Sequence, residues 1–449
     1  MTPQARPEPG QPRSWHFPAF ERRDVPGGQV IACDLPGRPL AVVSLLLDAG
    51  AVREPTGREG VAELAARALS EGTKQRDAQA FAVAGERLGA TWRAAADWDS
   101  LRCGFEVPAA ELGAAAELLT EAVREPALTA DTLARIREER IDEVGIDRSQ
   151  PGVRAVEAFA AEVFDPASRY ARPDAGDVAS LSAITDDDIR TFYDDRIAQG
   201  DATLILAGNL SKVDVDRVAT TVLDGRQKTD QPSTVAGQPG GTGRRVVIVD
   251  RPGAVQSMLV VGHDGPPRRI DDYVPMTMMA MVLGGMFGSR LNLKLREEKG
   301  YTYGAFAGFD ARRDGGVFLA RAAVQSEVTL PALRDLVEQL ERTHAEGVTD
   351  AELDQARSYR AGVFPINFAA VNAVASGLGD LVVHGFPDDH FDRLREAITA
   401  VGKDAVDAAA GSRLRPDDLV TVVVGDAAPI RAELETAGLG PVTVVRDEE

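Results

Sequence analysis

The sequence predicts an α+β fold made of two homologous halves, each a mostly antiparallel sheet packed with helices. Three observations support this prediction. Segments of the first half recur in the second at a nearly constant offset, a polar segment separates the halves, and each half mixes strand-like and helix-like patterns. A repeat this long indicates duplicated domains rather than a solenoid of short units.

Three pairs of segments carry the repeat. Each pair combines the same turn or capping residues with a similar apolar run, and each lies at a comparable place in its half. The pairs are Val30–Gly37 with Val246–Gly253, Asp201–Asn209 with Asp418–Asp426, and Leu128–Leu133 with Val348–Leu353, at offsets of 216, 217 and 220 residues. Similar offsets at three places indicate one duplication that spans most of the chain.

The boundary between the halves is predicted at residues 224–245. This stretch is rich in Gly, Pro, Ser, Thr and Gln and has almost no apolar side chains, as is typical of a linker. Residues 17–223 and 246–449 are therefore the two predicted domains. We expect residues 1–16, which are rich in Pro and Gln, to form a disordered tail.

Both halves are expected to combine strands with amphipathic helices. In Gly60–Leu69 the apolar residues recur at helical spacing, and the charged residues lie on the opposite face. Thr185, followed by three aspartates, is typical of an N-cap and an acidic first turn. The predicted strands are Val42–Leu47, Ala202–Gly208 and Gln256–Gly262, and the predicted helices are Gly60–Leu69, Ala110–Glu125, Thr132–Asp147 and Ile189–Asp195.

The composition indicates an ordinary globular protein, with 449 residues, 44% apolar and 27% charged. A net charge of −20 disfavours binding to nucleic acid or to an anionic membrane. The two cysteines, Cys33 and Cys103, form no C-x-x-C motif, which favours a reducing compartment. We find no apolar run of membrane-spanning length and no secretory signal, so we expect a cytoplasmic protein.

The region around the helix predicted at Gly60–Leu69 is the most informative. Ala51–Pro55 reads AVREP, Gly60–Arg67 reads GVAELAAR, and Glu71–Thr73 reads EGT. This region resembles the insulinase/pitrilysin family of zinc peptidases, which includes the mitochondrial processing peptidases. The family segment runs roughly A-G-S-x-x-E-P, G-x-A-H-x-x-E-H and G-T. The resemblance covers nearly the whole chain and implies that the two halves face each other across a cleft.

In the family, the H-x-x-E-H helix supplies two zinc-binding histidines and a glutamate that acts as general base. Here the three positions are Glu63, Ala66 and Arg67. Alanine accepts no proton, and arginine offers no lone pair to a metal. A fixed cation about 4 Å from a metal ion would be repelled by roughly 4 kcal/mol at an effective dielectric constant of about 20. We therefore expect no metal and no cofactor in this chain.

The resemblance places the third family ligand, a glutamate on a later helix, at Glu143. This glutamate is either a residual metal ligand or a partner of Arg67, which would then occupy the place of the metal and also pair with Glu63 one turn earlier. The second interpretation is favoured. His384 and His390 flank a loop that offers another candidate metal site, but ordinary surface histidines explain them better.

A second motif lies in the C-terminal half, where Leu283–Leu291 reads LGGMFGSRL and Leu295–Tyr303 reads LREEKGYTY. The family has L-G-G-x-x-x-S-R-L and L-R-E-x-x-G-x-x-Y here, so Arg296 and Tyr303 match its substrate-contacting pair. A tyrosine hydroxyl can donate to a developing oxyanion, and an arginine can position a peptide carbonyl. Alternatively, Arg296 only favours a helix dipole in the last turn, and Tyr303 belongs to a strand over Tyr301–Phe309.

The family also uses an edge strand, usually L-G-G-x-x-N-A-x-T, to pair with the bound peptide. The matching segment is Leu88–Asp97, in which Trp92, Arg93 and Ala94 surround the asparagine position, here Arg93. Strand addition uses backbone groups and can survive this change. The departures here and at the metal positions nevertheless suggest that this half handles peptide differently.

The combination of a dismantled metal site with a retained Arg/Tyr pair resembles the non-zinc chain of two-chain family members. The resemblance implies a complementing subunit that forms a heterodimer with an H-x-x-E-H partner, which would hold the zinc, and supplies Arg296 and Tyr303 for peptide hydrolysis. The alternative is a catalytically inactive relative that acts as a scaffold or peptide-binding module. The sequence leaves open the substrate, the partner's identity and self-association.

Overall fold

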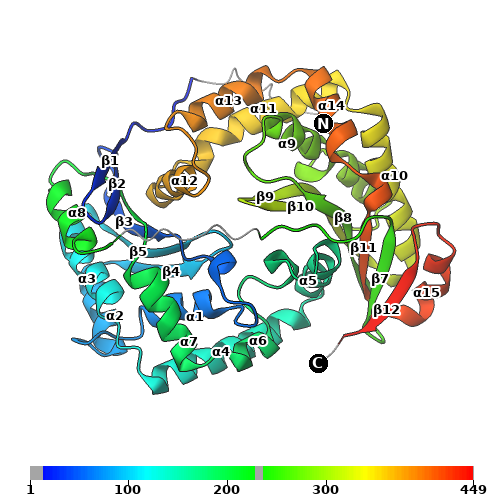
Figure 1. The fold of residues 1–449 in the computed structure, drawn as a ribbon. Coiled ribbons are helices and arrows are strands. Elements are labelled where there is room, and N and C mark those ends of the chain that lie inside the picture. Colours follow the sequence, from blue (N-terminus) through cyan, green and yellow to red (C-terminus); the bar gives the residue numbers. More distant parts are fainter. Residues whose placement is uncertain (1–13, 228–235, 448–449) are drawn as a thin grey trace, which may run out of the picture.

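The computed structural model describes residues 14–227 and 236–447, which form two six-stranded sheets with helices around them (Figure 1). The predicted α+β class with two halves is confirmed. In the first sheet the order is β1-β2-β6-β3-β5-β4, and in the second it is β12-β7-β11-β8-β10-β9. The strands are β1 (Glu21–Val25), β2 (Gly28–Asp34), β3 (Leu40–Leu47), β4 (Thr91–Ala96), β5 (Leu101–Pro108), β6 (Ala202–Gly208), β7 (Arg245–Asp250), β8 (Gln256–Gly265), β9 (Ala305–Arg312), β10 (Gly315–Gln325), β11 (Val420–Gly425) and β12 (Val442–Arg446).

The sequence repeat corresponds to a repeated hydrogen-bond pattern at the centre of each sheet. Asp34 at the end of β2 aligns with Gly208 of the parallel strand β6, and its Oδ1 accepts from the backbone N–H of Leu210 at 2.8 Å. Asp250 aligns with Gly425 in the same way, and its Oδ1 accepts from the equivalent amide at 2.9 Å. The halves differ at the outer strand, since β1 joins β2 antiparallel whereas β12 joins β7 parallel.

The helices follow the same duplicated order. Thr129 and Thr349, which belong to one of the repeated segment pairs, both act as N-caps of long helices. The helices of the first half are α1 (Val61–Ala68), α2 (Ala78–Arg87), α3 (Leu112–Arg124), α4 (Ala130–Ser149), α5 (Pro151–Val163), α6 (Val178–Ala183), α7 (Asp186–Phe192) and α8 (Val215–Leu223). Those of the second half are α9 (Tyr273–Ala280), α10 (Thr329–Glu346), α11 (Asp350–Asn367), α12 (Val371–Val383), α13 (His390–Ala400), α14 (Lys403–Arg413) and α15 (Ala427–Glu435).

The two halves exchange one helix each. Helix α5 of the first half packs on β8 and β11 of the second sheet, and α12 of the second half packs on β3 and β6 of the first (Figure 1). Phe159 of α5 is buried among Val249, Val260 and Val422, and this cluster joins the halves through apolar contacts. Two cavities are lined by residues of both halves, and one of them lies between α12 and the first sheet.

Segments outside the two sheets add further contacts between the halves. The ring of Trp15 stacks on that of Phe368 at 5.7 Å, which ties the start of the described chain to the end of α11. Before β7, Ala236 is fully buried, and its carbonyl accepts from the backbone N–H of Tyr170 at 3.3 Å. Residues 1–13 of the expected tail and 228–235 of the expected linker lie outside the described residues.

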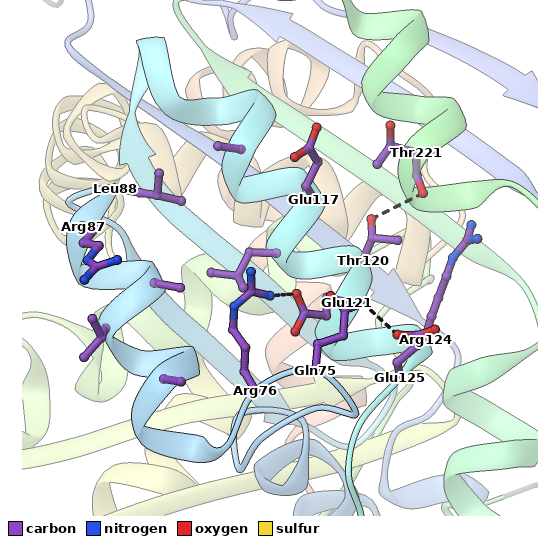
Figure 2. A pocket seen from close by; sticks show the side chains of 15 residues that line it. Gln75, Arg76, Arg87, Leu88, Glu117, Thr120, Glu121, Arg124, Glu125 and Thr221 are labelled. Atoms are coloured by element: carbon purple, nitrogen blue, oxygen red, sulfur yellow. Dashed lines mark hydrogen bonds and ion pairs between the residues drawn. The ribbon is translucent and has the colours of Figure 1, made fainter.

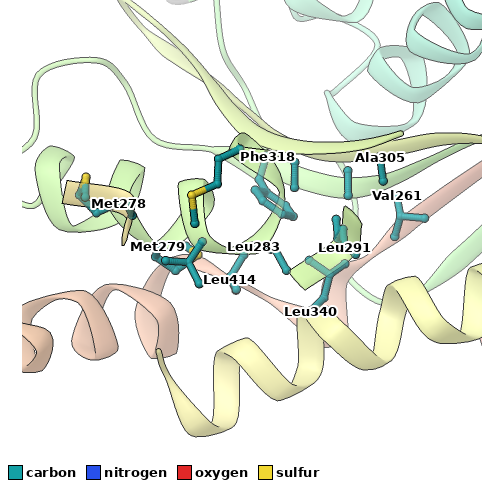
Figure 3. Packing of buried hydrophobic residues seen from close by; sticks show 14 of the residues in the cluster. Val261, Met278, Met279, Leu283, Leu291, Ala305, Phe318, Leu340 and Leu414 are labelled. Carbon is teal, nitrogen blue, oxygen red and sulfur yellow. The ribbon is translucent and has the colours of Figure 1, made fainter. Parts of the chain in front are cut away.

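The core of the second half fixes the segment that carries the predicted Arg/Tyr pair. Figure 3 shows Met279 and Leu283 packed beside Leu340 of α10 and Phe318 of β10. Helix α9 continues as the π-helical turn η5 (Met281–Gly285), and a second one, η6 (Asn292–Glu298), follows. Both turns contribute buried residues to the core. This packing fixes the start of the segment that connects η6 to β9.

The predicted N-cap at Thr185 and its acidic first turn are confirmed, since helix α7 begins at Asp186 and the Asp188 side chain completes a capping box with Thr185. One strand boundary differs clearly from expectation. The strand expected at Tyr301–Phe309 begins only at Ala305. Within the described residues no single helix is long and apolar enough to span a membrane, although α11 and α12, bent by 108° relative to each other, together have the length and apolar composition of a span.

Candidate functional site: a dismantled metal centre and a separate Arg/Tyr pair

Helix α1 holds the three family metal-site positions, and its start is fixed by a buried carboxylate. Its N-cap, Gly60, adopts a left-handed conformation (φ +99°) and has no side chain with which to cap the helix. Glu54 supplies the cap, since its Oε1 accepts from the backbone N–H groups of Gly60 at 3.0 Å and Ala62 at 2.9 Å. Its Oε2 accepts from the buried Arg169 guanidinium at 2.6 Å. This network places the first turn of α1 and was not predicted from the sequence.

The guanidinium of Arg67 joins the other two charged positions of the family site. Its Nε donates to Glu63 Oε1 at 2.8 Å, and its Nη1 and Nη2 donate to the two oxygens of Glu143 on α4 at 2.9 and 2.7 Å. The pairing expected for Arg67 is therefore present. The hydrogen bonds that Arg67 donates to Glu143, and then the one to Glu63, raise the pKa of Arg67, and the contact with Arg67 lowers the pKa of Glu143. The cation is thus fixed between the two carboxylates.

These residues do not fit a zinc ion. The side chain at the base position, Ala66, is a fully buried methyl group, and Arg67 fills the space between the carboxylates with its own positive charge. Glu63 also accepts weakly from the backbone N–H of Ala96 at 3.4 Å, so its second oxygen turns toward β4. No group of three or more His, Cys, Asp or Glu side chains suited to a metal occurs among residues 14–227 and 236–447.

The histidine pair near the loop after α12 is packed with aromatic rings. The ring of His390 stacks on Phe386 with centroids 3.9 Å apart, and His384 lies 5.4 Å from the same ring. Burial lowers the pKa of both histidines to about 4. The pair lies beside a phenyl ring, and it forms no part of a metal cluster in the described chain.

The predicted substrate strand is β4, and it forms the outer edge of the first sheet beside α1. Trp92 and Ala94 face the helices, where the Trp92 ring contacts Phe105 at 4.9 Å. Arg93 points to the opposite face, where its side chain is exposed. The structure therefore brings the edge strand next to Glu63 and Arg67.

Arg296 and Tyr303 lie in the other half, at the end of η6 and in the loop before β9. Arg296 pairs with Glu297, and its guanidinium lies 3.5 Å from the centroid of the Phe287 ring. Tyr303 is fully exposed at 101%, and in the described chain no hydrogen bond reaches its hydroxyl. The loop is fixed at its end by Asn292, whose amide bonds both the N–H and the C=O of Ala305.

The structure brings the predicted residues together only in part. Glu63, Arg67 and Glu143 form one cluster beside β4, whereas Arg296 and Tyr303 contact neither that cluster nor β4 in any hydrogen bond or ion pair of the described residues. Arg313, at the turn between β9 and β10, joins the halves because it pairs with Asp48 at 3.2 Å. No motif singled out this arginine, since its partner is far away in sequence.

A large open pocket of about 910 Å³ lies between α2 and α3 (Figure 2). Its lining combines small and aliphatic side chains with the ion pair between Arg76 and Glu121. Thr120, also in the lining, donates to the backbone of its own helix. None of the predicted site residues lines this pocket.

Fold and site together define an α+β protein of duplicated peptidase-like domains whose metal centre is replaced by an arginine–carboxylate cluster. A family model described as insulinase (peptidase family M16) matches residues 29–160, and one described as peptidase M16 inactive domain matches residues 183–359. The chain belongs to the insulinase family, peptidase family M16, and lacks its zinc motif.

The relatives agree with this assignment. The chain is 26% identical over 354 residues to an uncharacterized zinc protease of Mycobacterium tuberculosis, covering 77% of this chain and 80% of that protein. It is 23% identical over 399 residues to one of Streptomyces coelicolor, covering 87% and 86%. A peptidase M16 inactive domain from Pseudomonas fluorescens superposes with a TM-score of 0.83 at 25% identity, covering 91% of this chain and 98% of that one. A Helicobacter pylori protease shares the fold, with a TM-score of 0.82 at 20% identity over 91% and 99%.

Proposed function

We propose that this chain is the non-zinc subunit of a two-chain M16 peptidase and contributes Arg296 and Tyr303 to peptide hydrolysis by a zinc-bearing H-x-x-E-H relative. The observation that carries the proposal is the asymmetry between the halves. Arg67 occupies the metal positions and is held there by Glu143, whereas Tyr303 is fully exposed on a loop fixed to the core. A side chain with these properties is available to a substrate held by another chain.

The chemistry of the pair follows from what each side chain can donate. A tyrosine hydroxyl can donate a hydrogen bond to the oxygen of a peptide carbonyl as negative charge develops on it. A guanidinium can position that carbonyl with directional N–H groups. Arg296 is engaged by Glu297 and Phe287 in the free chain, so substrate would have to compete with Glu297 for its N–H groups.

An inactive scaffold or peptide-binding module is the second candidate. It is favoured by the same engagement of Arg296, and by the free edge of β4, which can bind an extended peptide without any chemistry. A gene for an H-x-x-E-H relative beside this one would favour complementation. Its absence would favour the binding module.

A three-way assay tests the proposal. Hydrolysis of a peptide library is measured with this chain alone, with the zinc-bearing relative alone, and with the two mixed. The proposal expects activity in the mixture only, and a large loss when the chain carries both Arg296→Ala and Tyr303→Phe. Equal activity of the relative with and without this chain would contradict it.

A further inference from the structure

We propose that Arg93 and the small cavity beside it select an acidic side chain in a peptide that pairs with the edge of β4. The proposal deepens the proposed function, because it names the chemistry of the peptide that this subunit binds. It rests on the strand edge, on the cavity and on an arginine that no hydrogen bond or ion pair engages within the part of the chain that the structure describes.

The outer edge of β4 carries backbone N–H and C=O groups that can pair with an added strand. The hairpin amide of Asp97 donates to the carbonyl of Ser100, and the amide of Ala96 turns the other way, toward Glu63. In an antiparallel pair, the backbone N–H and C=O groups of successive residues point alternately toward and away from the neighbouring strand. The N–H and C=O groups of Trp92 and Ala94 therefore point away from β5, as the amide of Ala96 does. In the described chain no backbone or side-chain group bonds them, so an extended peptide can add there.

A cavity of about 230 Å³ lies on the face of β4 and β5 that α12 covers. Gly104, directly opposite Arg93 in the register, is among its lining residues. A Cβ at Gly104 would lie 2.1 Å from the carbonyl oxygen of Val43 on β3, so this position cannot carry a larger residue without a shift of the backbone. Side chains of an added peptide that point to this face would lie beside Arg93 and enter this space.

The charges around the cavity favour a carboxylate. Arg102 on the same face is already bound, since it pairs with Asp380 at 2.8 Å and donates to the carbonyl of Ser376. Arg93 differs, because no hydrogen bond or ion pair engages its guanidinium within residues 14–227 and 236–447. The one carboxylate in the lining, Glu106, does not pair with it. An unpaired guanidinium at the rim of a cavity matches an aspartate or glutamate side chain.

The test measures binding of labelled peptides to this chain alone by fluorescence anisotropy at low salt. Three extended peptides alternate threonine with glutamate, glutamine or lysine, so that one face carries the variable side chain. We expect the glutamate peptide to bind about fivefold tighter than the glutamine peptide, as for a partly exposed ion pair. Arg93→Gln should abolish the preference, and Arg93→Glu should transfer it to the lysine peptide.

Arg334→Gln is the matched control, because Arg334 is exposed on α10 and its loss changes the net charge equally. This control should keep the preference. Equal binding of the glutamate and glutamine peptides, or a preference that survives in Arg93→Gln, would overturn the proposal. Failure to bind any of the three peptides would also overturn the proposal. The activity assay of the mixed subunits tests the proposed function separately, because it does not depend on this peptide preference.

Discussion

The Arg67 guanidinium forms a two-pronged ion pair with Glu143, with Nη1–Oε1 and Nη2–Oε2 distances of 2.9 and 2.7 Å. The two residues lie 76 positions apart, on α1 and α4, and the pair joins these helices. In the family this place is expected to hold the metal. The contact therefore replaces a metal bridge between the helices by an organic cation.

Arg67→Met should destabilise the fold, because it leaves Glu63 and Glu143 facing each other without a cation. We expect the free energy of unfolding to fall by about 1–2 kcal/mol, more than for a typical surface pair. Urea denaturation measures the change. Arg135→Met is the control, since its side chain is 48% exposed and its loss should change stability by less than about 0.5 kcal/mol. Equal losses in both variants would contradict a bridging role.

Restoring the family motif should restore metal binding. The triple variant Glu63→His, Ala66→Glu and Arg67→His places two imidazoles one turn apart on α1, opposite Glu143. We expect one zinc ion per chain in the variant and substoichiometric zinc in the natural protein, measured by elemental analysis after dialysis. A natural chain with stoichiometric zinc would contradict the replacement of the metal by Arg67.

His263 should make the fold sensitive to acid. Its Nε2 accepts from the backbone N–H of Arg415 at 3.2 Å, so the buried ring must be neutral, and burial lowers its pKa to about 4. The unfolded chain binds this proton near pH 6.5, so stability is full above that pH and is lost as pH falls toward 4. The loss should reach about 3 kcal/mol.

Chemical denaturation of wild type and His263→Gln between pH 7 and 4 measures this contribution. The glutamine cannot be protonated, so the variant should show a shallower decline with falling pH. Parallel curves for the two proteins would show that His263 does not titrate as described.

Glu54→Ala should be strongly destabilising, because it removes the cap of α1 and leaves the charge of Arg169, whose side chain is 7% exposed, without a carboxylate. Breaking a buried pair on one side typically costs about 3–5 kcal/mol. The double variant Glu54→Ala, Arg169→Met should recover part of the loss, since it removes the stranded charge. If the double variant loses as much free energy of unfolding as the two single variants lose in sum, the two residues do not form a coupled pair.

Much of the fold followed from local signals. The aspartate and glycine of each repeated segment predicted the duplication, and Asp34 and Asp250 indeed occupy equivalent places in the two sheets. The pairing of Arg67 with Glu63 followed from their spacing of four residues on one helix. Its pairing with Glu143 rested on the family resemblance.

Other features could not be predicted because they depend on distant contacts. The exchange of α5 and α12 leaves no local signal, since each helix would look equally amphipathic on its own sheet. The Asn292 side-chain amide bonds the backbone N–H and C=O of Ala305, the residue at which β9 begins, and this contact spans 13 residues of sequence. The capping network of Glu54 depends on Arg169, 115 residues later in the chain.

The most direct test of complementation is the turnover number of the mixed subunits when this chain carries Tyr303→Phe. We expect kcat to fall about a hundredfold with the complex intact, as for loss of one oxyanion donor. Tyr301→Phe is the control, because Tyr301 packs against the core and should leave kcat unchanged. Undiminished kcat in Tyr303→Phe would contradict the catalytic role and leave a binding module as the function.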